Sequence, residues 1–280
     1  MAFHLGYEHR TEVYSGNGRV DNTLGEDTSI TTFTPELSLS LGQGFSGTIA
    51  IPIVRMHYQI IRHQTMQGDP LPRYDEVQTG LSDVPVIIQW AGSPAGVSGV
   101  VAWGGLGLSV PIGLERDYPA LRGMEFGEVL TMGSGTWDPL IVHGFGVSEN
   151  SRVWSSAVVL RWTPYENRFG YRAGSVIQWE AALQQAILDT GVSAGLQLGY
   201  RHQWRARRDG LDVLNSGGDW LTLTPEIRWR AKDGLQLVAK VGLPIWRDIY
   251  AGPDEIQQLV NGQTDADQRW MLSVIYEMGE

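Results

Sequence analysis

The sequence predicts an all-β chain that folds as a transmembrane, antiparallel, up-and-down β-barrel of about twelve strands. Apolar and polar residues alternate along most of the chain, which is the pattern of strands with one apolar and one polar face. The connections between these segments alternate between short and long. The composition also fits, with 35 Gly, 11 Trp, 19% charged residues and no Cys. Glycine suits crowded sheets and turns, and Trp favours membrane interfaces.

The stretch from Thr34 to Leu41 shows the alternation clearly. Pro35 and the three leucines share one face of the expected strand, whereas Thr34, Glu36 and two serines share the other. Segment 194–205 divides in the same way between apolar or aromatic side chains and mostly polar ones. A barrel strand has this arrangement because one face meets lipid and the other meets the interior.

The same patterns give the expected strand boundaries along the chain. Strands are expected at residues 3–14, 30–41, 45–62, 81–92, 98–112, 137–148, 152–165, 174–188, 192–205, 220–231, 234–248 and 268–279. Short turns lie near 43–44, 93–96, 149–150, 189–191 and 232–234, and longer loops near 15–29, 63–80, 113–136, 206–219 and 249–267. Outer-membrane barrels have short periplasmic turns and long extracellular loops. Residues 1–280 are therefore expected to form a single barrel domain.

Hydropathy and charge point to the bacterial outer membrane and away from nucleic acid. No apolar run is long enough for a helical membrane span, and the mean hydropathy of -0.16 suits strands that meet lipid at every second residue. The net charge of -10 does not favour nucleic-acid binding. The chain starts on a strand pattern, so the export signal is expected to have been removed. Outer-membrane lipid and lipopolysaccharide are the expected surroundings.

Aromatic residues gather toward the ends of the expected strands. They are Tyr58, Trp90, Trp137, Trp154, Trp162, Trp204, Trp220, Trp229, Trp246, Tyr250 and Trp270. Aromatic girdles at the two membrane interfaces account for such positions. A soluble core would instead have to supply a partner for every buried indole N–H.

Charged and polar side chains recur on the faces that are expected to point inward. The candidate lumen-lining residues are Glu8, Arg10, Glu36, Arg55, His57, Asp83, Asp138, Arg161, Glu180, Arg201, Arg205, Glu226, Arg228, Lys240 and Arg269. In a soluble sandwich the same positions would form a solvated outer face. In a barrel, opposite charges would pair across the interior and the remaining ones would need water. Complete pairing would close the pore.

Sequence motifs for catalysis are absent. The chain has no G-x-S-x-G elbow, P-loop, H-E-x-x-H or cysteine-based metal pattern, and His143 is followed by Gly-Phe-Gly with no adjacent Ser. We therefore expect no catalytic residues, no cofactor and no metal site.

Four short motifs resemble a known family of outer-membrane transporters linked to the meta-pathway of phenol degradation. They are Gly80-Leu81-Ser82-Asp83-Val84, Ile51-Pro52-Ile53, Gly133-Ser134-Gly135-Thr136-Trp137-Asp138 and Gly170-Tyr171-Arg172-Ala173-Gly174. The resemblance extends from about residue 30 onward, and it implies a barrel that admits hydrophobic or aromatic compounds. The chain departs from the usual barrel terminus because it continues past Tyr276 to Glu280.

The leading functional expectation is a passive outer-membrane channel for small solutes. A closed barrel that acts as a scaffold, binds a protein partner or forms an oligomer is the first alternative. A membrane-embedded hydrolase of lipid or lipopolysaccharide is the second, and it would require a His close to a Ser or a carboxylate at one rim.

Overall fold

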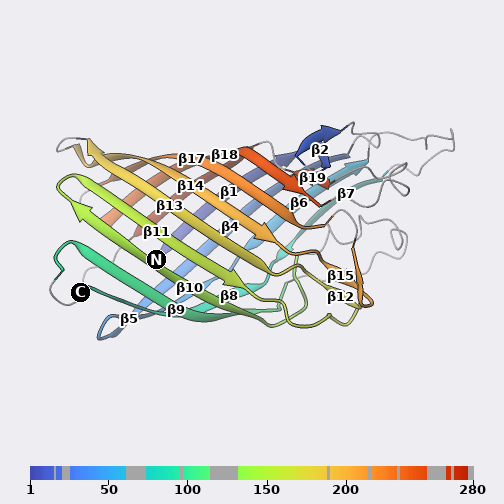
Figure 1. Cartoon of the computed structure of the whole chain (residues 1–280), viewed down its shortest axis with the longest axis horizontal. Coiled ribbons are helices and arrows are strands. Elements are labelled where there is room, and N and C mark those ends of the chain that lie inside the picture. The colour runs from blue at the N-terminus through green and yellow to red at the C-terminus, as the bar shows by residue number, and fades with distance from the viewer. Residues whose placement is uncertain are drawn as a thin grey trace.

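The computed structural model is a closed antiparallel barrel with its strands tilted against the barrel axis (Figure 1). It describes residues 1–15, 17–20, 26–60, 74–94, 97–113, 132–187, 190–213, 216–231, 234–250, 263–265 and 268–276. Within these ranges twelve strand passes build the wall, as the sequence predicts. No described residues form a helix that is long and apolar enough to cross a membrane.

Two of the strand passes are each built from two elements. In chain order the wall contains β1 (Ala2–Arg10), β4 (Glu26–Gly42), β5 (Phe45–Ala50) with β6 (Ile53–Ile60), β7 (Tyr74–Leu81) with β8 (Val84–Gly92), β9 (Val100–Val110), β10 (Asp138–Glu149), β11 (Arg152–Arg161), β13 (Val176–Ile187), β14 (Val192–Gln203), β17 (Gly218–Arg230), β18 (Leu235–Ile249) and β20 (Gln268–Tyr276). Two small sheets lie outside this order. They are β2 (Glu12–Ser15), β3 (Gly18–Val20) and β19 (Gln263–Asp265), and β12 (Tyr171–Arg172), β15 (Arg207–Arg208) and β16 (Leu211–Asp212).

The barrel closes where the first strand meets the last. Phe3 of β1 lies opposite Val274 of β20 on one side and Pro35 of β4 on the other. The Met1 ammonium group donates to the Tyr276 carbonyl oxygen at 2.9 Å, and the Tyr276 N–H donates to the Met1 carbonyl oxygen at 2.7 Å. Closure removes the sheet edges whose unpaired backbone groups could not be tolerated in hydrocarbon.

Side-chain polarity is reversed relative to a soluble protein. Large apolar side chains stand on the outer surface, including Leu106 at 69% and Ile88 at 57% exposure. The interior holds polar groups such as Asp138 and Thr28, both 0% exposed. An apolar exterior around a polar interior is the arrangement of a membrane barrel.

The strand ends that lead to the short turns lie at one end of the barrel, and those that lead to the long connections lie at the other, as predicted. The turn between β4 and β5 is tight, and Gly42, Gln43 and Gly44 all have positive φ angles of 84°, 54° and 81°. Glycine adopts this region without strain. Met1 and Tyr276 pair at the same end as these turns.

The bounds of two predicted strands are wrong, because two neighbouring strands of the wall are each interrupted by two residues. The expected strand 45–62 divides at Pro52, and the strand expected at 81–92 begins at Tyr74 and divides at Ser82 and Asp83. Pro52 has no N–H to donate, but its carbonyl oxygen accepts from the Ser82 N–H at 2.9 Å. The two breaks therefore lie side by side and bond to each other.

Some predicted boundaries also extend too far toward the long loops. The expected strand 3–14 leaves the wall after Arg10, because β2 pairs with β3 and β19 instead of the barrel. The strand expected at 152–165 ends at Arg161. Residues 277–279 of the last predicted strand lie outside the described part of the chain. The remaining strands end within a few residues of their predicted boundaries.

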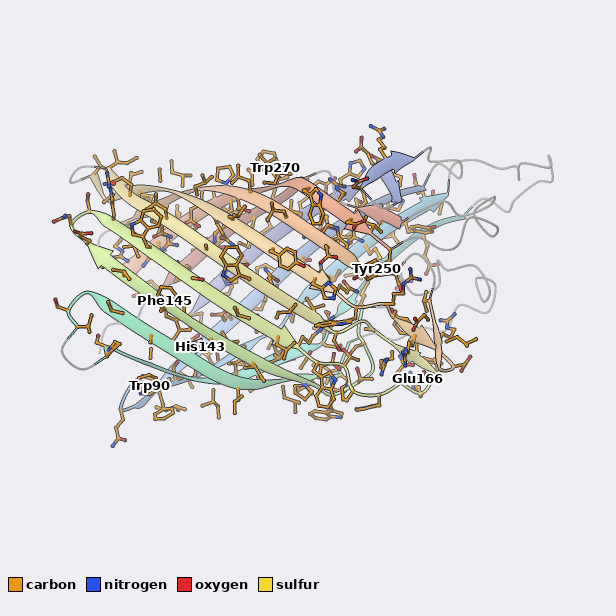
Figure 2. The ribbon with its side chains drawn as sticks, viewed as in Figure 1. Trp90, His143, Phe145, Glu166, Tyr250 and Trp270 are labelled. Atoms are coloured by element: carbon orange, nitrogen blue, oxygen red, sulfur yellow. The ribbon has the colours of Figure 1, made fainter. Side chains whose placement is uncertain are left out.

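Most exposed tryptophans form two groups on the outer surface. One group, Trp90, Trp154 and Trp229, lies near the short turns, and the other, Trp137, Trp162, Trp204, Trp246 and Trp270, lies near the long connections. Trp90 and Trp270 project from opposite sides of the ribbon (Figure 2). Such bands match the aromatic girdles of outer-membrane barrels. The girdle assignment is wrong for Tyr58 and Trp220, which are 1% and 5% exposed and point inward.

Gly144 offers a test of packing inside the wall. A Cβ atom there would lie 2.5 Å from the Trp103 ring and 2.7 Å from the Ser156 carbonyl oxygen, whereas one at Gly146 would have its nearest neighbours at 3.5 Å. We expect Gly144→Ala to lower the free energy of unfolding by about 1–3 kcal/mol in a urea titration, because the indole must move. Gly146→Ala is the matched control. Equal stability of the two variants would contradict this packing.

Candidate functional site

The polar interior of the barrel is the candidate functional site. Alternation along the strands sends inward eleven of the residues proposed from the sequence: Glu8, Arg10, Glu36, Asp138, Arg161, Glu180, Arg201, Glu226, Arg228, Lys240 and Arg269. Their arrangement is described below by the groups that they form.

Glu8 on β1 is the centre of the first charged group. Its carboxylate pairs with the Arg10 guanidinium on the same strand and with Arg269 Nε on β20 at 3.1 Å. Glu8 and Arg269 are direct cross-strand partners. One carboxylate therefore serves two guanidinium groups across the seam where the barrel closes.

Glu226 on β17 is the centre of the second group, and its side chain is only 6% exposed. Its carboxylate lies 3.0 Å from Lys240 Nζ and 3.0 Å from Arg228 Nη2, and it accepts from Gln184 Nε2 at 2.7 Å. A buried carboxylate needs such partners because transfer out of water is costly. This network fastens the inner faces of β17 and β18 to β13.

A third group lies near the break in the wall. Asp83 accepts from both the N–H and the hydroxyl of Ser134 at 2.6 Å and from the Gly113 N–H at 3.2 Å. Asp138 accepts from the Thr136 hydroxyl at 2.6 Å and lies 3.9 Å from Arg161 Nε. Ser134 and Thr136 are buried, so the segment before β10 folds against the inside of the wall.

A cavity of about 390 Å³ lies between the inner faces of β13, β14, β17, β18 and β20. Arg201 and Trp220 form one side of it, and the Arg201 guanidinium carbon lies 5.3 Å from the centre of the Trp220 ring. Glu180 also lines the cavity and accepts from Gln178 Nε2 at 2.5 Å. The cavity combines guanidinium, amide and aromatic surfaces.

His4 on β1 contacts a hydroxyl and a carboxylate. Its Nδ1 lies 2.8 Å from Ser273 Oγ, and its Nε2 lies 3.7 Å from Glu36 Oε2. The residue types are those of a hydrolytic triad. Ser273 is only 3% exposed, however, so its hydroxyl is not presented to a substrate. The contact ties β1 to β20 and β4 inside the barrel.

The structure contradicts the inward placement of Arg55 and His57. Arg55 is exposed, and His57 Nε2 lies 2.9 Å from Asp75 Oδ1 on the outer face of β7. Both are odd-numbered residues of β6 and lie on the same face as Ile53. Ile53 is exposed on the apolar exterior and pairs with the exposed Phe33 of β4. Arg55 and His57 lie in the part of β6 that leads to a long connection, and barrel strands approach the polar interface at such ends. Arg205 lies past the end of β14, with its guanidinium over the Tyr250 ring at 5.4 Å.

Sequence reasoning missed a polar cluster on the outer face near the long connections. Asp219 Oδ1 accepts from the Tyr200 hydroxyl at 2.5 Å and lies 2.9 Å from His202 Nδ1. His9 Nε2 likewise lies 2.9 Å from Asp27 Oδ1. These pairs join neighbouring strands, and no local sequence signal links their members. The described residues contain no cluster of His, Asp and Glu that could hold a metal ion.

Comparison with solved structures decides the fold. An outer-membrane channel from Pseudomonas putida F1 superposes with a TM-score of 0.67 over 98% of this chain and 94% of that chain, at 10% identity. This chain folds as an outer-membrane β-barrel. The transport unit of the autotransporter AIDA-I from Escherichia coli gives a TM-score of 0.49 at 12% identity, over 99% of this chain and 90% of that one. No family model and no curated protein matches the sequence.

The corrected orientation of β6 can be tested with single cysteines, because the barrel has none of its own. We expect Arg55→Cys to react with a 5-kDa-class polymer maleimide on the order of ten times faster than Met56→Cys, since only an exposed thiol is accessible to a bulky reagent. The measurement is the labelling rate of purified protein in detergent micelles. Faster labelling at Met56, which is 7% exposed, would restore the original assignment of Arg55 to the lumen.

Proposed function

We propose that this barrel is an outer-membrane channel through which small solutes diffuse passively. The observation that carries the proposal is the polar interior, where charged side chains from β13, β14, β18 and β20 line a cavity of about 390 Å³. A barrel of this strand number has room for side chains and a small solute. The fold of the Pseudomonas putida channel also supports it.

The class of solute follows from two further considerations. The resemblance of the short glycine-rich motifs implies hydrophobic or aromatic compounds. Trp220 and Met271 on the cavity wall support that choice, because an aromatic face and a thioether bind flat apolar groups. Outer-membrane lipid and lipopolysaccharide would surround the channel.

A closed barrel with a scaffolding or partner-binding role is the second candidate. The observation that favours it is the segment before β10, where Ser134 and Thr136 are buried against Asp83 and Asp138. A segment held inside a barrel can block it. The function would then lie in the outer surface or in the long connections.

Reconstitution into liposomes separates the two candidates. We expect purified barrel to admit a small neutral sugar and cause osmotic swelling, while liposomes without protein stay unswollen. Under the channel proposal, Asp83→Asn changes the swelling rate little, because the Asn side-chain oxygen can still accept from the Gly113 or Ser134 N–H group. A sealed wild-type barrel that opens on Asp83→Asn would favour the closed barrel, and absence of swelling by both proteins would overturn the channel.

A further inference from the structure

Among the inward-pointing charged residues described above, cationic side chains outnumber carboxylates. Arg10, Arg161, Arg201 and Arg269 enter the lumen from β1, β11, β14 and β20, and Arg201 and Arg269 line the same cavity. Four strands that are not all neighbours in the wall thus direct guanidinium groups into the lumen.

Carboxylates do not balance this region. Glu8 is shared between Arg10 and Arg269, and Asp138 lies 3.9 Å from Arg161. Glu180 lines the same cavity as Arg201 and Arg269, so these four guanidinium groups are accompanied by three carboxylates of the described residues. Around Glu226 cations also outnumber the carboxylate, because Glu226 contacts both Lys240 and Arg228.

Arg201 is the member of the group whose contacts are all neutral. It donates to the Gln203 Oε1 atom at 2.5 Å and stacks on Trp220, and it makes no ion pair with any described residue. A guanidinium group in this setting is stabilised by a charged acceptor, and its planar fork matches a carboxylate. Arg201 faces the cavity described above, so an acceptor could reach it there.

The rest of the cavity lining defines what else the ligand carries. Trp220 and Met271 supply an aromatic face and a flexible apolar contact, while Gln178 and Gln197 supply amide groups. Arg269 and Lys240 add further positive charge to the lining, and Glu180 is the carboxylate in it. A ligand with one negative group and a flat apolar part complements these surfaces.

We propose that the lumen contains a binding site for small organic monocarboxylates, in which Arg201 and Arg269 hold the carboxylate and Trp220 stacks on the apolar part. This inference rests on the proposed channel function for its role in uptake, but binding itself does not require conduction. With this site, the interior prefers anions over cations and over neutral aromatic compounds.

Equilibrium dialysis of the purified barrel with labelled benzoate tests binding directly. We expect saturable binding that Arg201→Gln weakens on the order of ten-fold, as loss of a charge-assisted contact predicts. Arg152→Gln is the matched control, because Arg152 is exposed on the outer face of β11, where it donates to Gln185 and lies away from the cavity. Trp220→Phe should retain benzoate, whereas Trp220→Leu should weaken benzoate more than acetate. Heat-modifiable gel migration checks that each variant is folded.

Planar-bilayer recordings in a KCl gradient supply the second measurement. We expect chloride to be favoured over potassium about three-fold or more, and Arg201→Gln to reduce the ratio while Arg152→Gln preserves it. Benzoate binding without any conductance would overturn the channel and leave the site standing. Conductance without benzoate binding, or with potassium favoured, would overturn the site and leave the channel standing. Absence of both would overturn both.

Discussion

The whole structure depends on the satisfaction of backbone hydrogen bonds in a medium without water. An unpaired N–H or C=O group in hydrocarbon costs several kcal/mol, so a sheet can cross a membrane only if it has no open edge. The pairing of β1 with both β20 and β4 meets this requirement. The reversed distribution of polar and apolar side chains then follows, because the closed wall has lipid on one side and polar groups on the other.

The same constraint shapes the interior. Charged side chains on the inner face cannot reach bulk water freely, so carboxylates such as Glu8 and Glu226 each contact more than one cation. This pairing holds neighbouring strands together, but it does not extend evenly around the lumen. Arg201 contacts a neutral amide and an aromatic ring and lines a cavity with Lys240 and Arg269, and this arrangement is the feature from which we infer a preference for carboxylates.

Much of the fold could be predicted because alternation acts locally. Along β17, Trp220 lies on the same face as the polar residues Thr222, Thr224 and Glu226. The alternation of the sequence therefore predicts its inward position. The charge of Arg55 favours an inward position, but Arg55 alternates with its neighbours on the same face of β6 as Ile53, which is the outer face. By contrast, the capping of Asp83 by Ser134 joins residues 51 positions apart, and the β7 strand gains its pairing from β6 rather than from its own pattern. Long-range contacts of this kind leave no periodic signal.

Barrel closure is the central claim, and a disulfide between the first and last strands tests it most directly. Leu5 lies opposite Leu272, and the cysteine-free chain gives no background. In outer-membrane fractions, mild oxidation should link Leu5→Cys to Leu272→Cys within one chain, because directly opposed Cβ atoms approach disulfide distance. Leu5→Cys with Tyr276→Cys, displaced along the strand, should remain unlinked. Failure of the first pair, or equal linking of both pairs, would contradict a closed barrel in this register.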